Sequence, residues 1–149
     1  MINTNTLKEM SELELLVAGC GDSVVRLKSE WNHIIKAIKT LGPVMPLTRN
    51  EYAVCEKNGV YNNVKIMNSM GYVLDDLNNL RLFISHWYHG FFVCENTTSG
   101  ESQSLQFFDN QGKAIHKIYL LELSDEKSFN TFITQFTSSD QSNFIYKLK

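Results

Sequence analysis

The spacing of apolar residues changes twice along this chain, and this change constrains the fold more than any other feature. Residues 7–18 and 29–41 carry apolar side chains at helical spacing, and each stretch ends at a glycine. Residues 124–136 repeat the helical pattern after an acidic start that suits a helix N-terminus. The segment between them has the shorter period of strands. The order helix, helix, sheet, helix predicts an α+β fold rather than a parallel α/β fold.

The middle of the chain predicts a large antiparallel sheet built from hairpins, on which the helices pack. From Val44 onward, β-branched and aromatic residues recur between turn signals, among them Asn58-Gly59 and residues 75–79. One strand is unusually long and is expected to bend near Gly90. The expected strands are Glu51 to Lys57, Val60 to Met67, Gly71 to Asp75, Leu80 to Cys94, Ser104 to Asp109 and Lys113 to Leu120.

A helix cap, a polar tail and the chain length complete the predicted organisation of the chain. Ser29 is the expected N-cap of the second helix. The tail from Ser138 to Lys149 is mostly polar, and it predicts either a linker or a docked terminal segment. At 149 residues, the chain is long enough to form one domain over residues 1–149 without disulfides or a metal.

Charge and apolar content exclude several classes of protein. Fourteen basic against sixteen acidic residues give a net charge of -2, and no basic run indicates a nucleic-acid partner. No apolar stretch is long enough to span a membrane, and the N-terminus lacks a signal-peptide pattern. Cys20, Cys55 and Cys94 are odd in number and far apart, which indicates reduced thiols. We therefore expect a cytoplasmic protein that is neither secreted nor membrane-embedded.

The segment from Leu80 to Val93 is the most informative for binding. Strand alternation places Arg81 and Phe83 on the same face, opposite Leu80 and Leu82. A Phe ring can pack on a large planar apolar ligand while a neighbouring guanidinium donates hydrogen bonds to its carboxylate arms. The alternative is that Arg81 lies on a solvated sheet face.

Three further residues can ligate a metal, each with a simpler structural interpretation. His86 and His89 are three apart, so a regular strand would point them to opposite faces unless the chain bends at Gly90. Cys55 can ligate heme iron as a thiolate, or it can be a small half-buried apolar side chain. His33 and His116 are weaker candidates. No motif for nucleotide binding, serine hydrolysis or a zinc protease is present, so the residues alone specify no catalysis.

Three long segments resemble the HemS/ChuS family of hemin-degrading, heme-utilisation proteins, and residues 11–28 are similar more weakly. The segments are Leu41 to Tyr61, Leu80 to Val93, and Ser104 to Tyr119. Members of that family typically have two similar halves, each a large antiparallel sheet with helices, and this chain resembles the N-terminal half. A smaller relative, the ChuX/HutX type, is a single unit that dimerises. The resemblance implies heme as the ligand.

The resemblance also implies roles for individual residues. Arg81 corresponds to the family's distal arginine, which reaches the open side of the iron, and Phe83 corresponds to an aromatic residue that lines the pocket. The proximal histidine belongs to the second half, so the iron ligand here is missing or comes from elsewhere. Several relatives have histidine at the position of Cys55, so a secondary heme site there would be altered.

Three functions remain open at this point. The first is cytoplasmic heme binding and trafficking in heme-iron acquisition, from a heme importer to a heme oxygenase. The second is a heme-degrading enzyme that releases iron with electrons from an external donor. The third is a structural or dimerisation half that supports a heme site in a second half. In each case a homodimer or a second homologous half is expected to cover the aromatic sheet face.

Overall fold

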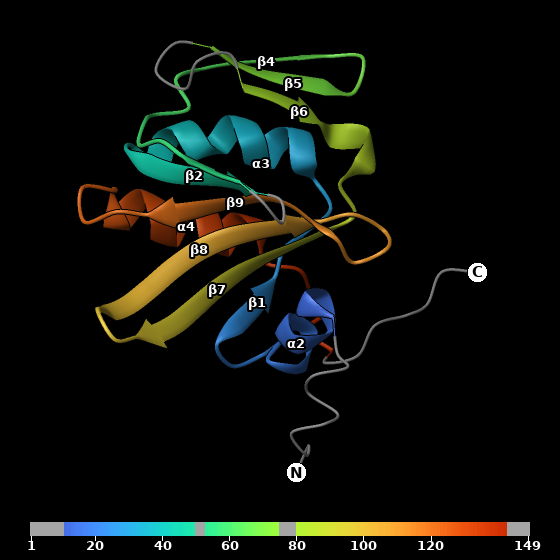
Figure 1. The fold of residues 1–149 in the computed structure, drawn as a ribbon, viewed down its shortest axis with the longest axis vertical. Coiled ribbons are helices and arrows are strands. Elements are labelled where there is room, and N and C mark those ends of the chain that lie inside the picture. Colours follow the sequence, from blue (N-terminus) through green and yellow to red (C-terminus); the bar gives the residue numbers. More distant parts are fainter. Residues whose placement is uncertain (1–10, 50–52, 75–79, 143–149) are drawn as a thin grey trace.

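The computed structural model describes residues 11–49, 53–74 and 80–142 and shows an α+β fold (Figure 1). The helices of this part are α2 (Glu12–Ala18), α3 (Trp31–Ala37), which the 3-10 helix η1 (Ile38–Leu41) continues, and α4 (Glu126–Phe136). The strands are β1 (Val24–Arg26), β2 (Val44–Arg49), β3 (Val54–Glu56), β4 (Asn63–Met67), β5 (Met70–Leu74), β6 (Leu80–Phe83), β7 (His89–Thr97), β8 (Gly100–Phe108) and β9 (Ala114–Leu120). The predicted class, a large antiparallel sheet with two N-terminal helices and one C-terminal helix, is confirmed.

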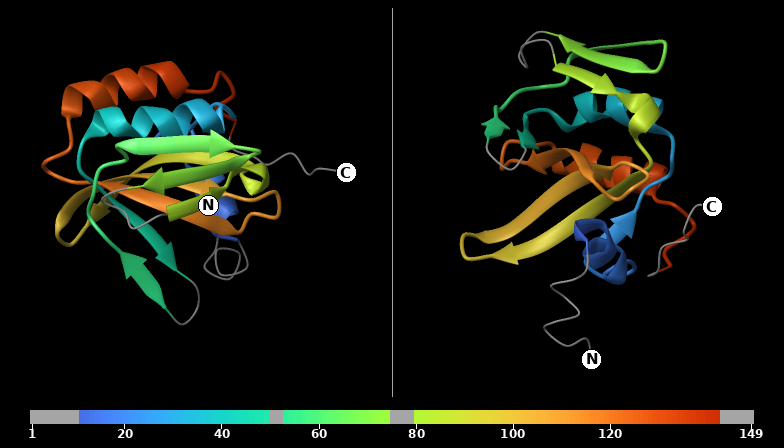
Figure 2. Two further views of the ribbon diagram at one scale, coloured as in Figure 1. Left: turned by 90° about the horizontal axis from the view of Figure 1, so that it is seen from above. Right: turned by 45° about the vertical axis from the view of Figure 1, so that its right-hand side comes forward.

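A six-stranded antiparallel sheet forms the centre, in the order β1-β7-β8-β9-β2-β3. Because side chains alternate along a strand, its two faces bury different residues. Leu105 and Phe107 join the main core under α3 and α4, whereas Phe91 and Val93 pack against α2 on the other face. Figure 2 shows α3 and α4 side by side over the same face of this sheet.

A second, three-stranded antiparallel sheet, in the order β4-β5-β6, lies on the opposite side of α3 (Figure 1). Its inner side chains, including Val73 and Leu82, belong to the same apolar core as Ile34 and Ile38 of the helical layer. Helix α3 is therefore sandwiched between the two sheets. The outer face of the three-stranded sheet is turned away from this core.

The predicted long strand from Leu80 to Cys94 is wrong. It is two strands in different sheets, β6 and β7, separated by the 3-10 helix η2 (Ile84–His86). The break occurs because Ile84 and Trp87 are both buried, at 6% and 4% exposure, and a spacing of three residues fits a helical turn rather than a strand. Gly90 lies within β7, where a Cβ atom would come within 2.7 Å of the Trp31 ring.

The predicted hairpin at Asn58-Gly59 is also wrong, because the strands on either side of it belong to different sheets. Strand β3 pairs with β2, and β4 pairs with β5 in the other sheet. Gly59 instead exchanges backbone hydrogen bonds with Val44, at 2.8 and 2.9 Å. Two strands were not predicted from the sequence: β2, which contains Pro46, and β1, which has only three residues.

The structure confirms the predicted start of the third helix but not that of the second. Helix α4 begins after Asp125, whose carboxylate accepts a hydrogen bond from the Ser128 amide, as its acidic start predicts. Ser29 is not the cap of α3, because Glu30 holds that position without a side-chain hydrogen bond. Residues 138–142 dock on β1 rather than leading away from it, since the Ser138 amide donates to the Arg26 carbonyl. The predicted features at residues 7–10, 50–52, 75–79 and 143–149 lie outside the described residues.

Candidate functional site

A row of two cations and a phenol crosses the outer face of the three-stranded sheet. Tyr72 on β5 lies opposite Lys65 on β4 and opposite Arg81 on β6. Lys65 and Arg81 are exposed, and Tyr72 is half-buried. Side chains at opposed positions on one face have Cβ atoms about 5 Å apart, so both cations lie beside the phenol. We call Lys65, Tyr72 and Arg81 the cationic row.

An apolar row lies directly beside the cationic row. Met70 on β5 is opposite Met67 on β4 and opposite Phe83 on β6. Phe83 is 55% exposed and Met67 is 61% exposed, although both side chains are large and apolar. We call Met67, Met70 and Phe83 the apolar row, and the two rows together the outer face. A ligand or protein that covered this face would remove apolar area from water, which is favourable by about 25 cal/mol per Å².

Arg81 and Phe83 share the outer face, as strand alternation predicts, while Leu82 between them is buried at 4% exposure. The guanidinium of Arg81 makes no hydrogen bond or ion pair with any other residue in the described part of the chain. In the isolated chain, Arg81 therefore lies on a solvated face, as the alternative interpretation has it. The same exposure leaves its five N–H donors free for an anionic ligand.

Cys55 and His86 are not part of this face. Cys55 is on β3 of the six-stranded sheet, opposite Thr48, and it is exposed rather than half-buried. His86 ends η2, directly after β6, with an exposed side chain. The strand-based pairing of His86 with His89 does not apply, because only His89 is in a strand.

His89 lies in a different place, on the wall of a cavity between β1, β7 and the start of α3. Burial lowers the pKa of its imidazole below the usual value, and the nearby Arg26 guanidinium lowers this pKa further. Within the described ranges, no group of three or more His, Cys, Asp or Glu side chains is placed to hold a metal ion. Of the predicted residues, Arg81 and Phe83 thus lie on the outer face, His89 in this cavity, Cys55 at the edge of the large sheet and His86 on η2.

The two remaining histidines have structural positions. His116 is buried between the sheet and α3, where its Nε2 is 2.8 Å from the Tyr61 hydroxyl and its Nδ1 is 3.4 Å from the Thr48 hydroxyl. Burial lowers the pKa of His116 to about 4, so the ring is neutral near pH 7. His33 is exposed on α3, 3.4 Å from the Glu30 carboxylate.

Four residues of the outer face were not predicted as site residues: Lys65, Met67, Met70 and Tyr72. Their alternation with Ile66 and Gly71 is visible in the sequence, and it indicates that they share a face. The register that aligns them with Arg81 and Phe83 depends on which strands pair. The pairing of β6 with β5 does not follow from the sequence when residues 80–94 are predicted to form one strand.

No helix in the described part of the chain has both the length and the apolar character needed to cross a membrane.

Comparison with known proteins gives family matches over most of the chain. Residues 9–136 match the family model described as "Haemin-degrading HemS.ChuX domain". The hemin transport protein HemS of Yersinia enterocolitica is 36% identical over 136 residues, which cover 91% of this chain and 39% of HemS. The hemin transport protein HmuS of Yersinia pestis is 37% identical over 132 residues, covering 88% of this chain and 38% of HmuS. The chain thus spans about two fifths of the length of these relatives.

Solved structures of the same family also match this chain over most of its length. The heme-bound form of PhuS, a heme-binding protein from Pseudomonas aeruginosa, superposes with a TM-score of 0.86 at 34% identity, over 96% of this chain and 42% of PhuS. ChuS, an Escherichia coli heme oxygenase, gives a TM-score of 0.87 at 33% identity, over 96% of this chain and 43% of ChuS. ChuX shares the fold, with a TM-score of 0.73 at 15% identity, over 87% of this chain and 83% of ChuX.

Proposed function

This chain belongs to the haemin-degrading HemS/ChuX family, and we propose that it binds heme on the outer face of its three-stranded sheet and passes the heme on. The observation that carries this proposal is the position of the apolar row directly beside the cationic row. Heme has the matching chemistry, since it is a planar apolar macrocycle with two carboxylate arms. The relatives named as hemin transport and heme-binding proteins support the same ligand class.

Each row has a distinct part in this proposal. The Phe83 ring and the thioethers of Met67 and Met70 contact the macrocycle, because flexible Met side chains adapt to a large aromatic surface. Arg81 and Lys65 donate to the propionates, and Arg81 can do so with two parallel hydrogen bonds. Burial of the apolar row supplies affinity, while the cations orient the macrocycle.

Tyr72 is our candidate for contact with the iron. Tyrosine oxygen is one of the axial ligands that proteins use for ferric heme. Lys65 and Arg81 flank Tyr72 in the register, so the phenol stands between two cationic strand neighbours on the face where heme would bind. This assignment would supply an iron ligand from the chain itself, in place of a histidine from a second half.

The outer face is exposed to solvent, so heme bound there would have protein on only one of its two sides. We propose that a second copy of the chain or a second homologous half covers the other side. The relatives HemS and HmuS are more than twice as long as the matched region, which leaves room for such a half. In this proposal residues 1–149 form one HemS-like unit. We further propose that the unit acts in the cytoplasm, between a heme importer and a heme oxygenase.

Heme degradation is the second candidate function, favoured by the similarity to the heme oxygenase ChuS over 96% of this chain. It requires an external electron donor, because oxidative opening of the macrocycle consumes electrons and dioxygen. Incubation of the heme-bound chain with a reductant, followed by absorption spectroscopy for linear tetrapyrrole products, separates the two candidates. Unchanged heme supports trafficking, whereas conversion to a bilin supports degradation.

The third candidate, a scaffold half whose heme site lies entirely elsewhere, is tested by heme binding itself. Titration of the purified chain with hemin, followed at the Soret band, should give a saturable shift. Arg81→Ala and Phe83→Ala should each raise the Kd about tenfold, which corresponds to about 1.4 kcal/mol. Lys113→Ala and Leu123→Ala are matched controls, because these exposed residues lie outside the outer face. A folded chain that leaves the free-hemin spectrum unchanged would support the scaffold function.

A further inference from the structure

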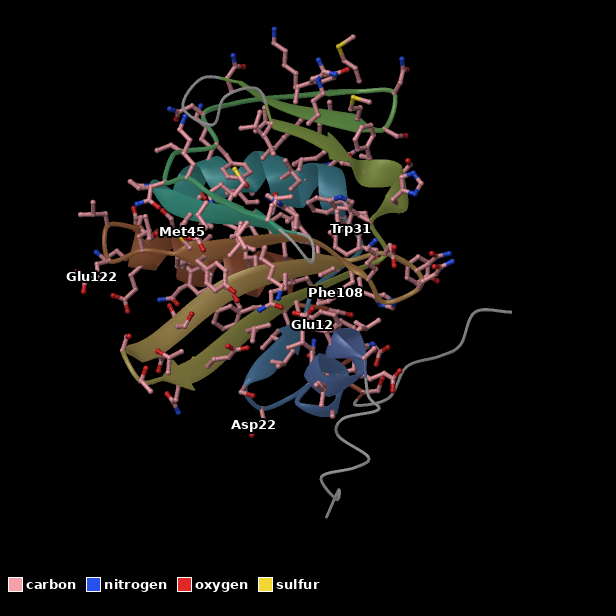
Figure 3. The ribbon with its side chains drawn as sticks, viewed as in Figure 1. Glu12, Asp22, Trp31, Met45, Phe108 and Glu122 are labelled. Atoms are coloured by element: carbon pink, nitrogen blue, oxygen red, sulfur yellow. The ribbon has the colours of Figure 1, made fainter. Side chains whose placement is uncertain are left out.

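A cavity of about 510 Å³ opens at the N-terminal end of α3, beside the first residues of β7. No residue of the cationic or apolar row lines it. Its walls come from β1, the start of α3, the beginning of β7 and the segment after α4. Figure 3 shows Trp31, one of its lining residues, at the N-terminal end of α3. A volume of this size fits a small organic ligand.

Aromatic side chains form much of the wall and are held rigidly. Trp31, Trp87 and Tyr88 all line the cavity. The Trp87 ring stacks on Phe107 with a centroid distance of 4.4 Å, and Trp31 lies 6.3 Å from Trp87. Gly90 lets Trp31 approach β7, because any Cβ atom there would meet the indole ring. The cavity therefore has a preformed aromatic surface, which suits a flat ring.

Arg26 is the only Lys or Arg among the described residues that line the cavity, and its side chain is only 16% exposed. Its Nη1 lies 3.3 Å from the Asp140 carboxylate, and its Nη2 donates to the Ser142 carbonyl at 3.0 Å. The Asp140 side chain is 48% exposed, so one partly solvated carboxylate is the counter-charge of a mostly buried guanidinium. A carboxylate from a ligand can share or replace that contact.

Hydrogen-bonding capacity also remains unused at these walls. The Nε of Arg26 and the Nε1 of Trp87 are both buried and have no acceptor within the described part of the chain. Buried donors without acceptors are rare in native proteins and cost about 1–3 kcal/mol each. Both donors belong to residues that line the cavity, but protein atoms cover them, so a ligand would reach them only if a side chain moved.

From these observations we infer that the cavity binds a small aromatic carboxylate, with its ring against the tryptophan wall and its carboxylate at Arg26. The neutral imidazole of His89 adds an uncharged polar wall, so the anion is recognised by Arg26. This site is separate from the outer face and does not depend on heme binding. The class of ligand follows from the pairing of an aromatic wall with one buried cation.

The chain contains two tryptophans, and both line the cavity, so intrinsic fluorescence reports its occupancy directly. We would titrate the full chain with 3-phenylpropionate and, in parallel, with its neutral analogue 3-phenylpropionamide. The acid should change the fluorescence saturably with a Kd of about 1 mM or tighter, as expected for so small a molecule. The amide should bind at least tenfold more weakly. A non-saturable response, or equal binding of acid and amide, would overturn the inference.

Variants place the binding in the cavity. Arg26→Gln should weaken binding of the acid at least tenfold, whereas Lys113→Gln, which removes an exposed positive charge outside both sites, should leave it unchanged. Circular dichroism checks that both variants fold. If Arg26→Gln does not fold, Tyr88→Ala replaces it, with Leu123→Ala as its control, because Tyr88 is 41% exposed and its loss leaves the core intact. Equal effects of the cavity variant and its control would contradict the proposed site.

Discussion

Tyr72 and Arg81 lie opposite each other on strands β5 and β6, and their side chains share the outer face of the three-stranded sheet. Lys65 lies on the other side of Tyr72, so the phenol has a cation in each neighbouring strand. Two residues along, Met70 lies in the same way between Met67 and Phe83. This arrangement, a cationic row beside an apolar row, is the basis of the heme-binding proposal.

The first prediction concerns the iron. Replacement of Tyr72 by Phe removes the hydroxyl group and keeps the ring, so the chain should still bind hemin through the rest of the outer face. The visible spectrum of the ferric complex should change, because a ligand oxygen has been lost. Tyr88→Phe is the control, since Tyr88 lines the separate cavity. Identical ferric spectra for the wild type and Tyr72→Phe would show that the phenol does not reach the iron.

The second prediction concerns stability against pH. Burial disfavours the charged ring and lowers the pKa of His116 from its ordinary value of 6.5 to about 4 in the folded chain. As the pH falls, His116 therefore binds a proton at a higher pH in the unfolded chain than in the folded chain. The contribution of His116 to stability is fully present above pH 6.5 and is lost as the pH falls from 6.5 to about 4. A shift of this size corresponds to at most about 3 kcal/mol.

Urea unfolding at several pH values measures this effect. His116→Gln should be less stable than the wild type near pH 7, since it disturbs the contacts with Tyr61 and Thr48. Its free energy of unfolding should fall less steeply between pH 6.5 and 4, because glutamine does not titrate. Leu123→Ala changes an exposed residue that does not titrate; it provides the control and should keep the wild-type slope. A slope in His116→Gln as steep as in the wild type would count against this explanation.

The sequence predicted the helices and the outward face of β6 well, because both depend on local spacing. Phe129, Phe132 and Phe136 form the buried stripe of α4 that their spacing indicates. The prediction of one continuous strand failed at residues 84–88 for a non-local reason. Strands β6 and β7 belong to different sheets, and the chain between them buries Ile84 and Trp87 in the core. Strand partners are set by tertiary packing. The sequence therefore predicted that Arg81 and Phe83 share a face, but not which residues of β4 and β5 lie beside them.

A third prediction tests the packing at that turn. Gly90→Ala places a Cβ atom 2.7 Å from the Trp31 ring and 3.1 Å from the Phe107 ring, both of which are held by other aromatic contacts. Overpacking of this kind should lower the free energy of unfolding by about 1–3 kcal/mol. At Gly19 the nearest added contact is looser, at 3.3 Å from a Val24 methyl group, so Gly19→Ala should cost less. Chemical denaturation compares the two, and an equal or larger loss for Gly19→Ala would contradict the packing argument.

A fourth prediction concerns self-association. If a second copy covers the outer face, light scattering coupled to size exclusion should show dimers at micromolar concentration. Phe83→Lys should shift the equilibrium to monomer, because it puts a charge in the apolar row. Leu123→Lys changes an apolar residue that is 79% exposed elsewhere and should leave the dimer intact. A wild-type chain that stays monomeric throughout would exclude self-association and favour a second homologous half.

The most direct test of the central claim is hemin binding by the double variant Arg81→Ala/Phe83→Ala, which removes one member of each row. We expect a saturable Soret shift in the wild type. In the double variant the loss of affinity should exceed the tenfold loss of either single variant and reach at most about 100-fold, because the two residues share one ligand and their effects are not independent. Lys113→Ala/Leu123→Ala should bind as the wild type does. Wild-type affinity in Arg81→Ala/Phe83→Ala would place heme somewhere other than the outer face and would contradict the account.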